Sequence, residues 1–268
     1  MNNFYTGNLR KMKTAELSPV QYVLQLGEEK IEMNTLLGKS VKFTHTGKIF
    51  CINCGNKTKK SFAQGFCYTC FVESPNNSPC IINPELCEGH LGKGRDVEWE
   101  QKYHVQPHIV YLALTNIVKV GVTREPQIPN RWIDQGAREG LVFARVPYRQ
   151  LAGAIEVVLK QYVTDRTSWQ RMLKNDLGDD LSLEEAKEEL MEYLEDELQQ
   201  YITFREELVD IEYPVLEYPE KIKSLSFDKT PEIEQTLVGI RGQYLMFEGG
   251  QVLNIRKFTG YNVDFAHG

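Results

Sequence analysis

The spacing of the cysteines constrains this chain more than any other feature of its sequence. Four of the six cysteines form two Cys-x-x-Cys pairs, Cys51 with Cys54 and Cys67 with Cys70. Each pair places two thiolates on one turn, and two such turns together supply the four sulfur ligands of a tetrahedral zinc ion. Gly55 follows the first pair and can adopt the left-handed backbone conformation that exposes amide groups to the sulfurs. The polar segment between the pairs suits the tip of a ribbon hairpin.

The alternative to zinc is two disulfides or a set of buried free thiols. The N-terminus lacks the apolar core of a signal peptide, and no apolar run approaches the roughly 18 residues of a membrane span. We therefore expect a cytoplasmic protein without membrane contact. A reducing compartment favours metal binding over disulfides, so zinc is the preferred interpretation.

A second metal site is predicted in the segment that follows. The pattern Cys80-x6-Cys87-x2-His90 brings three zinc ligands into a region that otherwise lacks apolar periodicity. His104 is expected to complete the shell in preference to His108, because His108 enters an apolar strand. Buried thiols and surface histidines are the alternative here. The sequence thus predicts two structural zinc ions per chain.

Charge is distributed unevenly along the chain. The net charge of −6 combines +5 over residues 1–75, −3 over 76–100, +6 over 101–175, −13 over 176–212 and −1 over 213–268. The basic segments are compatible with nucleic acid, DNA or RNA, although ordinary solvated faces would give the same pattern. The acidic segment is expected to be a solvated helix face, or else an arm that contacts a protein or the basic groove. The predicted phosphate contacts are Lys57, Lys59, Lys60, Arg124 and Arg138.

Apolar periodicity predicts an α+β fold. The most legible segment has the order β-β-α-β-α, with Pro129 opening its first helix. Ser182-x-x-Glu185 is a capping box that predicts one long helix over 182–208. The other expected elements are strands over 20–26, 30–34, 40–45, 108–115, 118–123 and 141–146, helices over 131–134 and 151–163, and a hairpin over 244–256.

These elements suggest five segments along the chain. We expect the first and last to be β structures that pack together, with the rest of the chain inserted between them. The segments are an N-terminal β segment (1–50), a zinc-binding segment (51–104), a β-β-α-β-α domain (105–175), an acidic helix (176–210) and a C-terminal β segment (211–268).

The β-β-α-β-α segment resembles the GIY-YIG endonuclease superfamily over roughly 60 residues. The resemblance is carried by residues 110–112 and 118–123, by Arg131, and by Ala152-x3-Glu156. The chain is also similar to an uncharacterised family of unknown function that joins cysteine knuckles to such a core. Residues 131–137 and the motif at 165–169 carry that second similarity.

The nuclease resemblance implies roles for four residues. Tyr111 would activate water or carry its proton, Arg131 would stabilise the phosphate charge, and Glu156 would hold one Mg²⁺ or Mn²⁺. Lys119 stands where the superfamily has its second tyrosine and could bind phosphate. The alternatives are a core aromatic for Tyr111, an ion-pair partner for Arg131 and a structural carboxylate for Glu156. We therefore expect either a metal-dependent phosphodiesterase, a non-catalytic nucleic-acid-binding module or a zinc-stabilised adaptor.

Overall fold

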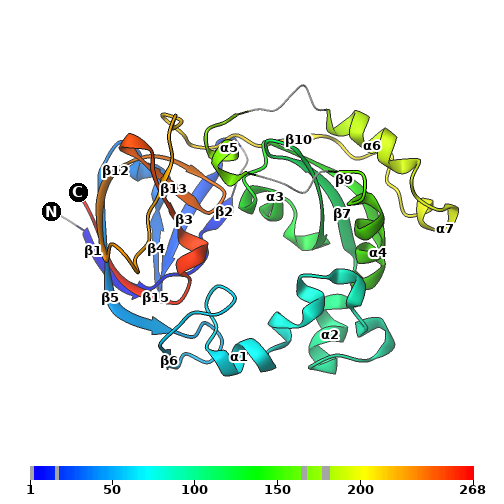
Figure 1. Ribbon diagram of the computed structural model, residues 1–268, viewed down its shortest axis with the longest axis horizontal. Helices are drawn as coiled ribbons and strands as arrows, with labels where there is room; N and C mark the ends of the chain where they lie inside the picture. The colour runs from blue at the N-terminus through cyan, green and yellow to red at the C-terminus, as the bar shows by residue number, and fades with distance from the viewer. Residues whose placement is uncertain (1–2, 16–17, 164–167, 177–181) are drawn as a thin grey trace. The chain divides into compact units, whose positions relative to one another are not determined.

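The computed structural model describes residues 3–15, 18–163, 168–176 and 182–268 and shows a mixed α+β protein (Figure 1). The chain forms two compact units. The first contains Met1–Val72 and Glu212–Gly268, and the second contains Glu73–Ile211. Most of the motif at 165–169 lies outside the described residues, as does the start of the acidic segment.

The first unit is built on an eight-stranded sheet to which both ends of the chain contribute. Strands β1 and β15 pair antiparallel, so Asn3 lies opposite His267. Side chains alternate between the core and solvent, and in β15 Val263 and Phe265 are fully buried. The order is β1 (Asn3–Asn8), β15 (Tyr261–His267), β5 (Ser40–Phe50), β12 (Glu232–Arg241), β13 (Tyr244–Phe247), β14 (Gln251–Asn254) and β11 (Lys223–Ser224), with β6 (Lys57–Thr58) beside β5.

A separate three-stranded sheet in this unit has the order β2 (Lys13–Ala15), β3 (Gln21–Leu26) and β4 (Glu29–Glu32). The expected hairpin over 244–256 is present as the antiparallel pair β13 and β14. Gly249 in its turn has φ +72°, a conformation that L-residues with a side chain rarely adopt.

The second unit is built on a four-stranded antiparallel sheet with the order β10 (Val209–Asp210), β9 (Glu139–Val146), β7 (His108–Leu114) and β8 (Val118–Arg124). Helix α3 (Asn130–Asp134) precedes β9, and α4 (Arg149–Leu159) follows it, so the expected β-β-α-β-α order is present. Val110 and Leu112 on one face of β7 pack in a core with Ile155 of α4. The opposite face carries Tyr111.

The prediction of one long acidic helix was wrong. Ser182 caps α6 (Leu183–Met191) as expected, because its hydroxyl accepts from the Glu185 amide. However, the helix ends there, and α7 (Asp196–Gln199) is separate. The break allows Leu194 to be buried in the core and Tyr193 to stack on Tyr162 with centroids 3.6 Å apart. Packing against the sheet therefore outweighs helix propensity in a segment whose crowded carboxylates repel one another.

The expected zinc-binding segment 51–104 is divided between the two units. Its first half belongs to the ribbon beside β5, which leads into α1 (Tyr68–Glu73). Its second half consists of short 3-10 helices and α2 (Val97–His104). The 3-10 helices are η2 (Pro75–Asn77), η3 (Pro79–Ile81), η4 (Pro84–Leu86) and η5 (Gly89–Leu91).

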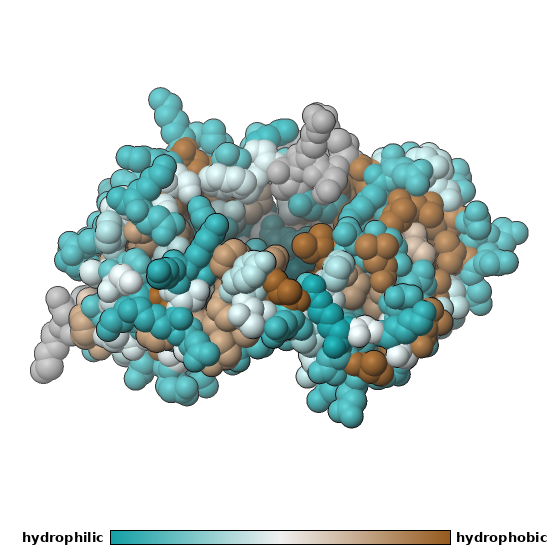
Figure 2. Space-filling view, turned by 60° about the horizontal axis from the view of Figure 1, so that its bottom comes forward, coloured by the Kyte–Doolittle hydropathy of each residue, from teal (hydrophilic) through white to brown (hydrophobic). Residues whose placement is uncertain are grey.

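Hydrophobic side chains reach the surface of the second unit at Ile82, Leu86 and Leu91, which are more than half exposed. Figure 2 shows brown, hydrophobic groups among the teal ones on the visible face. None of the helices in the described part of the chain combines the length and apolar character needed to cross a membrane.

Candidate metal centres and the nuclease-like cluster

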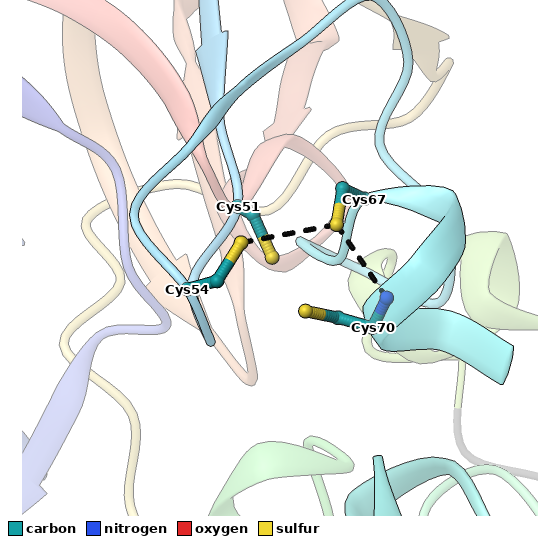
Figure 3. Close-up of side chains that lie close together, drawn as sticks. All are labelled: Cys51, Cys54, Cys67 and Cys70. Atoms are coloured by element: carbon teal, nitrogen blue, oxygen red, sulfur yellow. Dashed lines mark hydrogen bonds between the residues drawn. The ribbon is translucent and has the colours of Figure 1, made fainter. Parts of the chain in front are cut away.

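The structure brings the four ribbon cysteines together. Cys51 follows β5 directly, and Cys67 and Cys70 lie at the start of α1. The four sulfur atoms all lie within 4.8 Å of one another. The sulfurs of Cys54 and Cys67 are 3.9 Å apart, and Figure 3 shows the four side chains pointing toward one another. This geometry can hold one tetrahedral ion, and four thiolates are typical ligands of zinc.

The ionisation of the thiols also fits a bound cation. Burial opposes ionisation of Cys51, but the backbone amides of Cys67, Cys54 and Asn53 donate to its sulfur and lower its pKa to about 6. At Cys70 the Asn53 side chain donates and favours the thiolate, yet burial and the neighbouring sulfurs outweigh it and raise the pKa to about 12. Cys70 therefore stays a thiol at neutral pH unless a cation offsets the charge of the neighbouring sulfurs.

A second cluster forms in the 73–104 segment of the second unit. It consists of Cys80, Cys87, Glu100 and His104, all buried, with ligand atoms within 4.8 Å of one another. His104 Nδ1 lies 3.3 Å from the Cys87 sulfur and 3.9 Å from the Cys80 sulfur. Glu100 contacts the same nitrogen. Two thiolates, an imidazole and a carboxylate are all zinc ligands, so these residues also fit a zinc ion.

The pKa values of the two thiols in this cluster are shifted in opposite directions. Cys80 and His104 donate to the Cys87 sulfur, and the pKa of Cys87 falls to about 4 although burial opposes the change. The charged Cys87 and burial in turn raise the pKa of Cys80. One thiolate is thus present without metal, and a divalent cation would favour the second.

Glu100 was missed by the sequence reasoning, although a signal for it exists. Glu100 and His104 stand four residues apart on α2, so they share one helix face. His90, the predicted ligand, is not among the clustered side chains; its ring stacks on Tyr148 at 4.7 Å. His108 is buried in β7 and donates from Nδ1 to the Gln106 carbonyl at 2.7 Å. The preference for His104 over His108 therefore agrees with where the structure places the two rings.

The second cluster is attached to helix α4. Arg149 donates to the carbonyl oxygens of Cys80 and Ile81, each at 3.0 Å. Gly153 lies against η4 so closely that a Cβ there would stand 2.1 Å from the Glu85 nitrogen. The 3-10 helices around the cysteines are therefore positioned by the helix that also carries Glu156.

Tyr111 occupies the centre of β7, opposite Gly121 of β8. The residue is fully buried, and its hydroxyl accepts from Gln135 Nε2 at 2.6 Å. A Cβ at Gly121 would lie 2.4 Å from the Tyr111 hydroxyl oxygen, so only glycine fits there. Gly140 likewise leaves room for Trp132, since a Cβ would lie 2.3 Å from its indole. These two glycines let side chains from β7 and α3 fill one face of the sheet.

Of the residues of the nuclease resemblance, Tyr111 and Glu156 are buried, whereas Arg131 and Lys119 are half-buried. The electrostatic interaction with the Tyr111 hydroxyl, together with a hydrogen bond to it, raises the pKa of Arg131 against the opposing effect of burial. Burial raises the pKa of Tyr111, so its hydroxyl stays protonated at neutral pH. Burial also raises the pKa of Glu156, against the opposing effect of Lys160, whose Nζ lies 3.1 Å from its Oε1. One oxygen of the buried Glu156 carboxyl is thus already in contact with an ammonium group.

The predicted basic contacts fall into two groups. Lys57, Lys59 and Lys60 are exposed on the ribbon of the first unit. In the second unit Arg124 lies over the Tyr103 ring at 5.1 Å, and Arg138 pairs with Glu139 at 3.2 Å. Lys119 is half-exposed on β8, where it lies opposite Ala113 of β7 in the strand register.

Comparison with known proteins gives a family and no activity. A family model described as "Protein of unknown function (DUF2797)" matches residues 38–263. Neither the curated proteins nor the solved structures provide a match.

Proposed function

We propose that this chain, which belongs to the DUF2797 family of proteins of unknown function, is a zinc-stabilised nucleic-acid-binding protein. The observation that carries the proposal is the ribbon of the first unit. Three exposed lysines stand on a short segment between the two cysteine pairs. A metal ion fixes that segment, so the charges are presented on a rigid support.

Charge geometry explains why the ribbon suits a phosphate backbone. Lys57 lies on β6, opposite Phe50 of β5, and therefore has a fixed place in the sheet. Lys60 lies over the Phe62 ring at 5.3 Å, which holds its stem without neutralising its charge. Lys57 and Lys59 form no ion pair with any residue that the structure describes. Phosphate groups are the simplest counterions for such a row of ammonium groups.

Binding is favoured over cleavage by the state of the nuclease-like cluster. Tyr111 is fully buried, and Glu156 is buried beside Lys160. A phosphodiester would have to reach both residues for chemistry to occur. The resemblance to nucleases is therefore interpreted as a likeness of scaffold.

The test is binding of the full chain to fluorescent single-stranded and duplex DNA and RNA over a range of salt concentrations. Affinity should fall steeply with salt, with a log–log slope of roughly −0.7 per phosphate contact on single strands and −0.9 on duplex DNA. Lys57→Gln should weaken binding to every sequence and reduce the slope by about one contact. Lys30→Gln is the matched control, because Lys30 is exposed on β4 of the other sheet. Binding that is absent at low salt, or insensitive to salt, would refute the proposal.

A further inference from the structure

A cavity in the first unit joins the ribbon to the C-terminal strands. Its volume is about 740 Å³, within the range of small-molecule sites. Two chain segments far apart in sequence supply most of its lining, residues 59–64 of the ribbon and 254–261 near the C-terminus. The cavity lies entirely within one unit and is distinct from both cysteine clusters.

The lining is strongly basic. Lys59 and Lys60 come from the ribbon, and Arg256 and Lys257 come from η8 (Ile255–Phe258). Asp228 is the carboxylate among the described lining residues. Its Oδ1 accepts from the Tyr261 hydroxyl at 2.9 Å. The described lining thus contains four cationic side chains and one carboxylate that already accepts a hydrogen bond, which leaves the cavity with an excess of positive charge.

Hydrogen bonds hold the two walls of the cavity together. Arg256 Nε donates to Gln64 Oε1 at 2.5 Å. Ser61 Oγ donates to the Thr259 carbonyl at 3.3 Å. The Asn254 side chain accepts from the Lys257 amide and so fixes the start of η8. These bonds fix the Arg256 side chain and the backbone that carries Lys257, and such preorganisation lowers the entropic cost of binding an anion.

The backbone of the ribbon wall is strained where it borders the cavity. Ala63 and Gln64 are consecutive residues with φ of 41° and 64°, a conformation that residues other than glycine rarely adopt. Two such residues cost on the order of 1 kcal/mol each or more, and strain of this kind is concentrated at ligand-binding loops. Both residues line the cavity.

We propose that this cavity binds a terminal phosphate, carried either by a free nucleotide or by the end of a nucleic-acid strand. A terminal phosphate carries a charge of about −1.5 to −2 at neutral pH, which suits several cations better than the single charge of an internal phosphodiester does. The volume admits the attached nucleoside. For a strand end the inference rests on the proposed function, whereas for a free nucleotide it stands alone.

The test compares probes that differ only by one phosphate. Binding of AMP and of adenosine to the full chain is measured by calorimetry. Binding of one oligonucleotide with a 5′-phosphate, a 3′-phosphate or hydroxyl ends is measured by fluorescence anisotropy. At least one phosphorylated probe should bind about tenfold more tightly than its unphosphorylated counterpart. Lys257→Gln should remove most of that preference, and Lys229→Gln, which alters an exposed lysine outside the cavity, should leave it unchanged.

The outcomes separate this inference from the proposed function. Equal, salt-dependent binding of all oligonucleotides, with no binding of AMP, would overturn the cavity assignment and leave nucleic-acid binding intact. Binding of AMP without binding of any oligonucleotide would support the cavity and refute the proposed function. A phosphate preference that survives Lys257→Gln and Arg256→Gln alike would also overturn the assignment.

Discussion

Gly153 offers a sharp test of how the second cysteine cluster is held. In an exposed helix, replacing glycine with alanine stabilises the protein by about 1 kcal/mol. Here the new Cβ would stand 2.1 Å from the Glu85 nitrogen and 2.4 Å from the Pro84 carbonyl carbon. These are backbone atoms, so η4 must move away from α4. Overpacking of this kind costs about 3 kcal/mol at the upper end of its usual range. The gain of about 1 kcal/mol in helix propensity offsets part of that cost, so Gly153→Ala should destabilise the protein by about 2 kcal/mol.

The same substitution should affect the metal content. Cys87 follows η4 directly, so displacement of η4 should disturb the second cluster and leave the ribbon cysteines unaffected. Urea unfolding and elemental zinc analysis are the assays. Val157→Ala is the control, because Val157 is exposed on the same helix. If Gly153→Ala is neutral or stabilising, or if zinc is lost equally from both clusters, the packing argument fails.

The remaining predictions concern single side chains. Burial lowers the pKa of His108 from 6.5 to about 4, so the unfolded chain takes up this proton first as the pH falls. The contribution of neutral His108 to the free energy of unfolding is complete above pH 6.5 and is lost as the pH falls toward 4, about 3 kcal/mol in all. His108→Asn should therefore weaken the pH dependence of the free energy of unfolding between these values, and an unchanged pH dependence would contradict the assignment. Glu100→Gln should release one zinc ion and His90→Gln should release none; the reverse result would restore His90 as the ligand. Mg²⁺ or Mn²⁺ should produce no cleavage of single-stranded, duplex or branched substrates, and cleavage that Glu156→Gln abolishes would replace the binding proposal.

Much of the fold could be predicted from the sequence because the elements concerned are determined by neighbouring residues. The order β-β-α-β-α, the cap at Ser182 and the hairpin around Gly249 each depend on residues adjacent in sequence. The break after α6 was not predictable in this way. It depends on Tyr162 and on a core assembled from distant strands.

The candidate sites also divide into features that neighbouring residues determine and features that depend on the folded chain. Cys-x-x-Cys spacing identifies the ribbon cluster because each pair forms one turn. The spacing of Glu100 and His104 places both on one face of α2, but only the folded chain shows that this face, and not His90, lies beside Cys80 and Cys87. The basic cavity joins residues almost 200 positions apart, such as Gln64 and Arg256, and only the folded chain reveals it.

Native mass spectrometry of the full chain, alone and mixed with a 5′-phosphorylated oligonucleotide at low salt, tests the central claim most directly. The measured masses report bound zinc and bound nucleic acid in one experiment. The account predicts two zinc ions per chain and a complex that carries the oligonucleotide together with both ions. A chain that carries no metal, or one that carries zinc and binds no oligonucleotide, would contradict it.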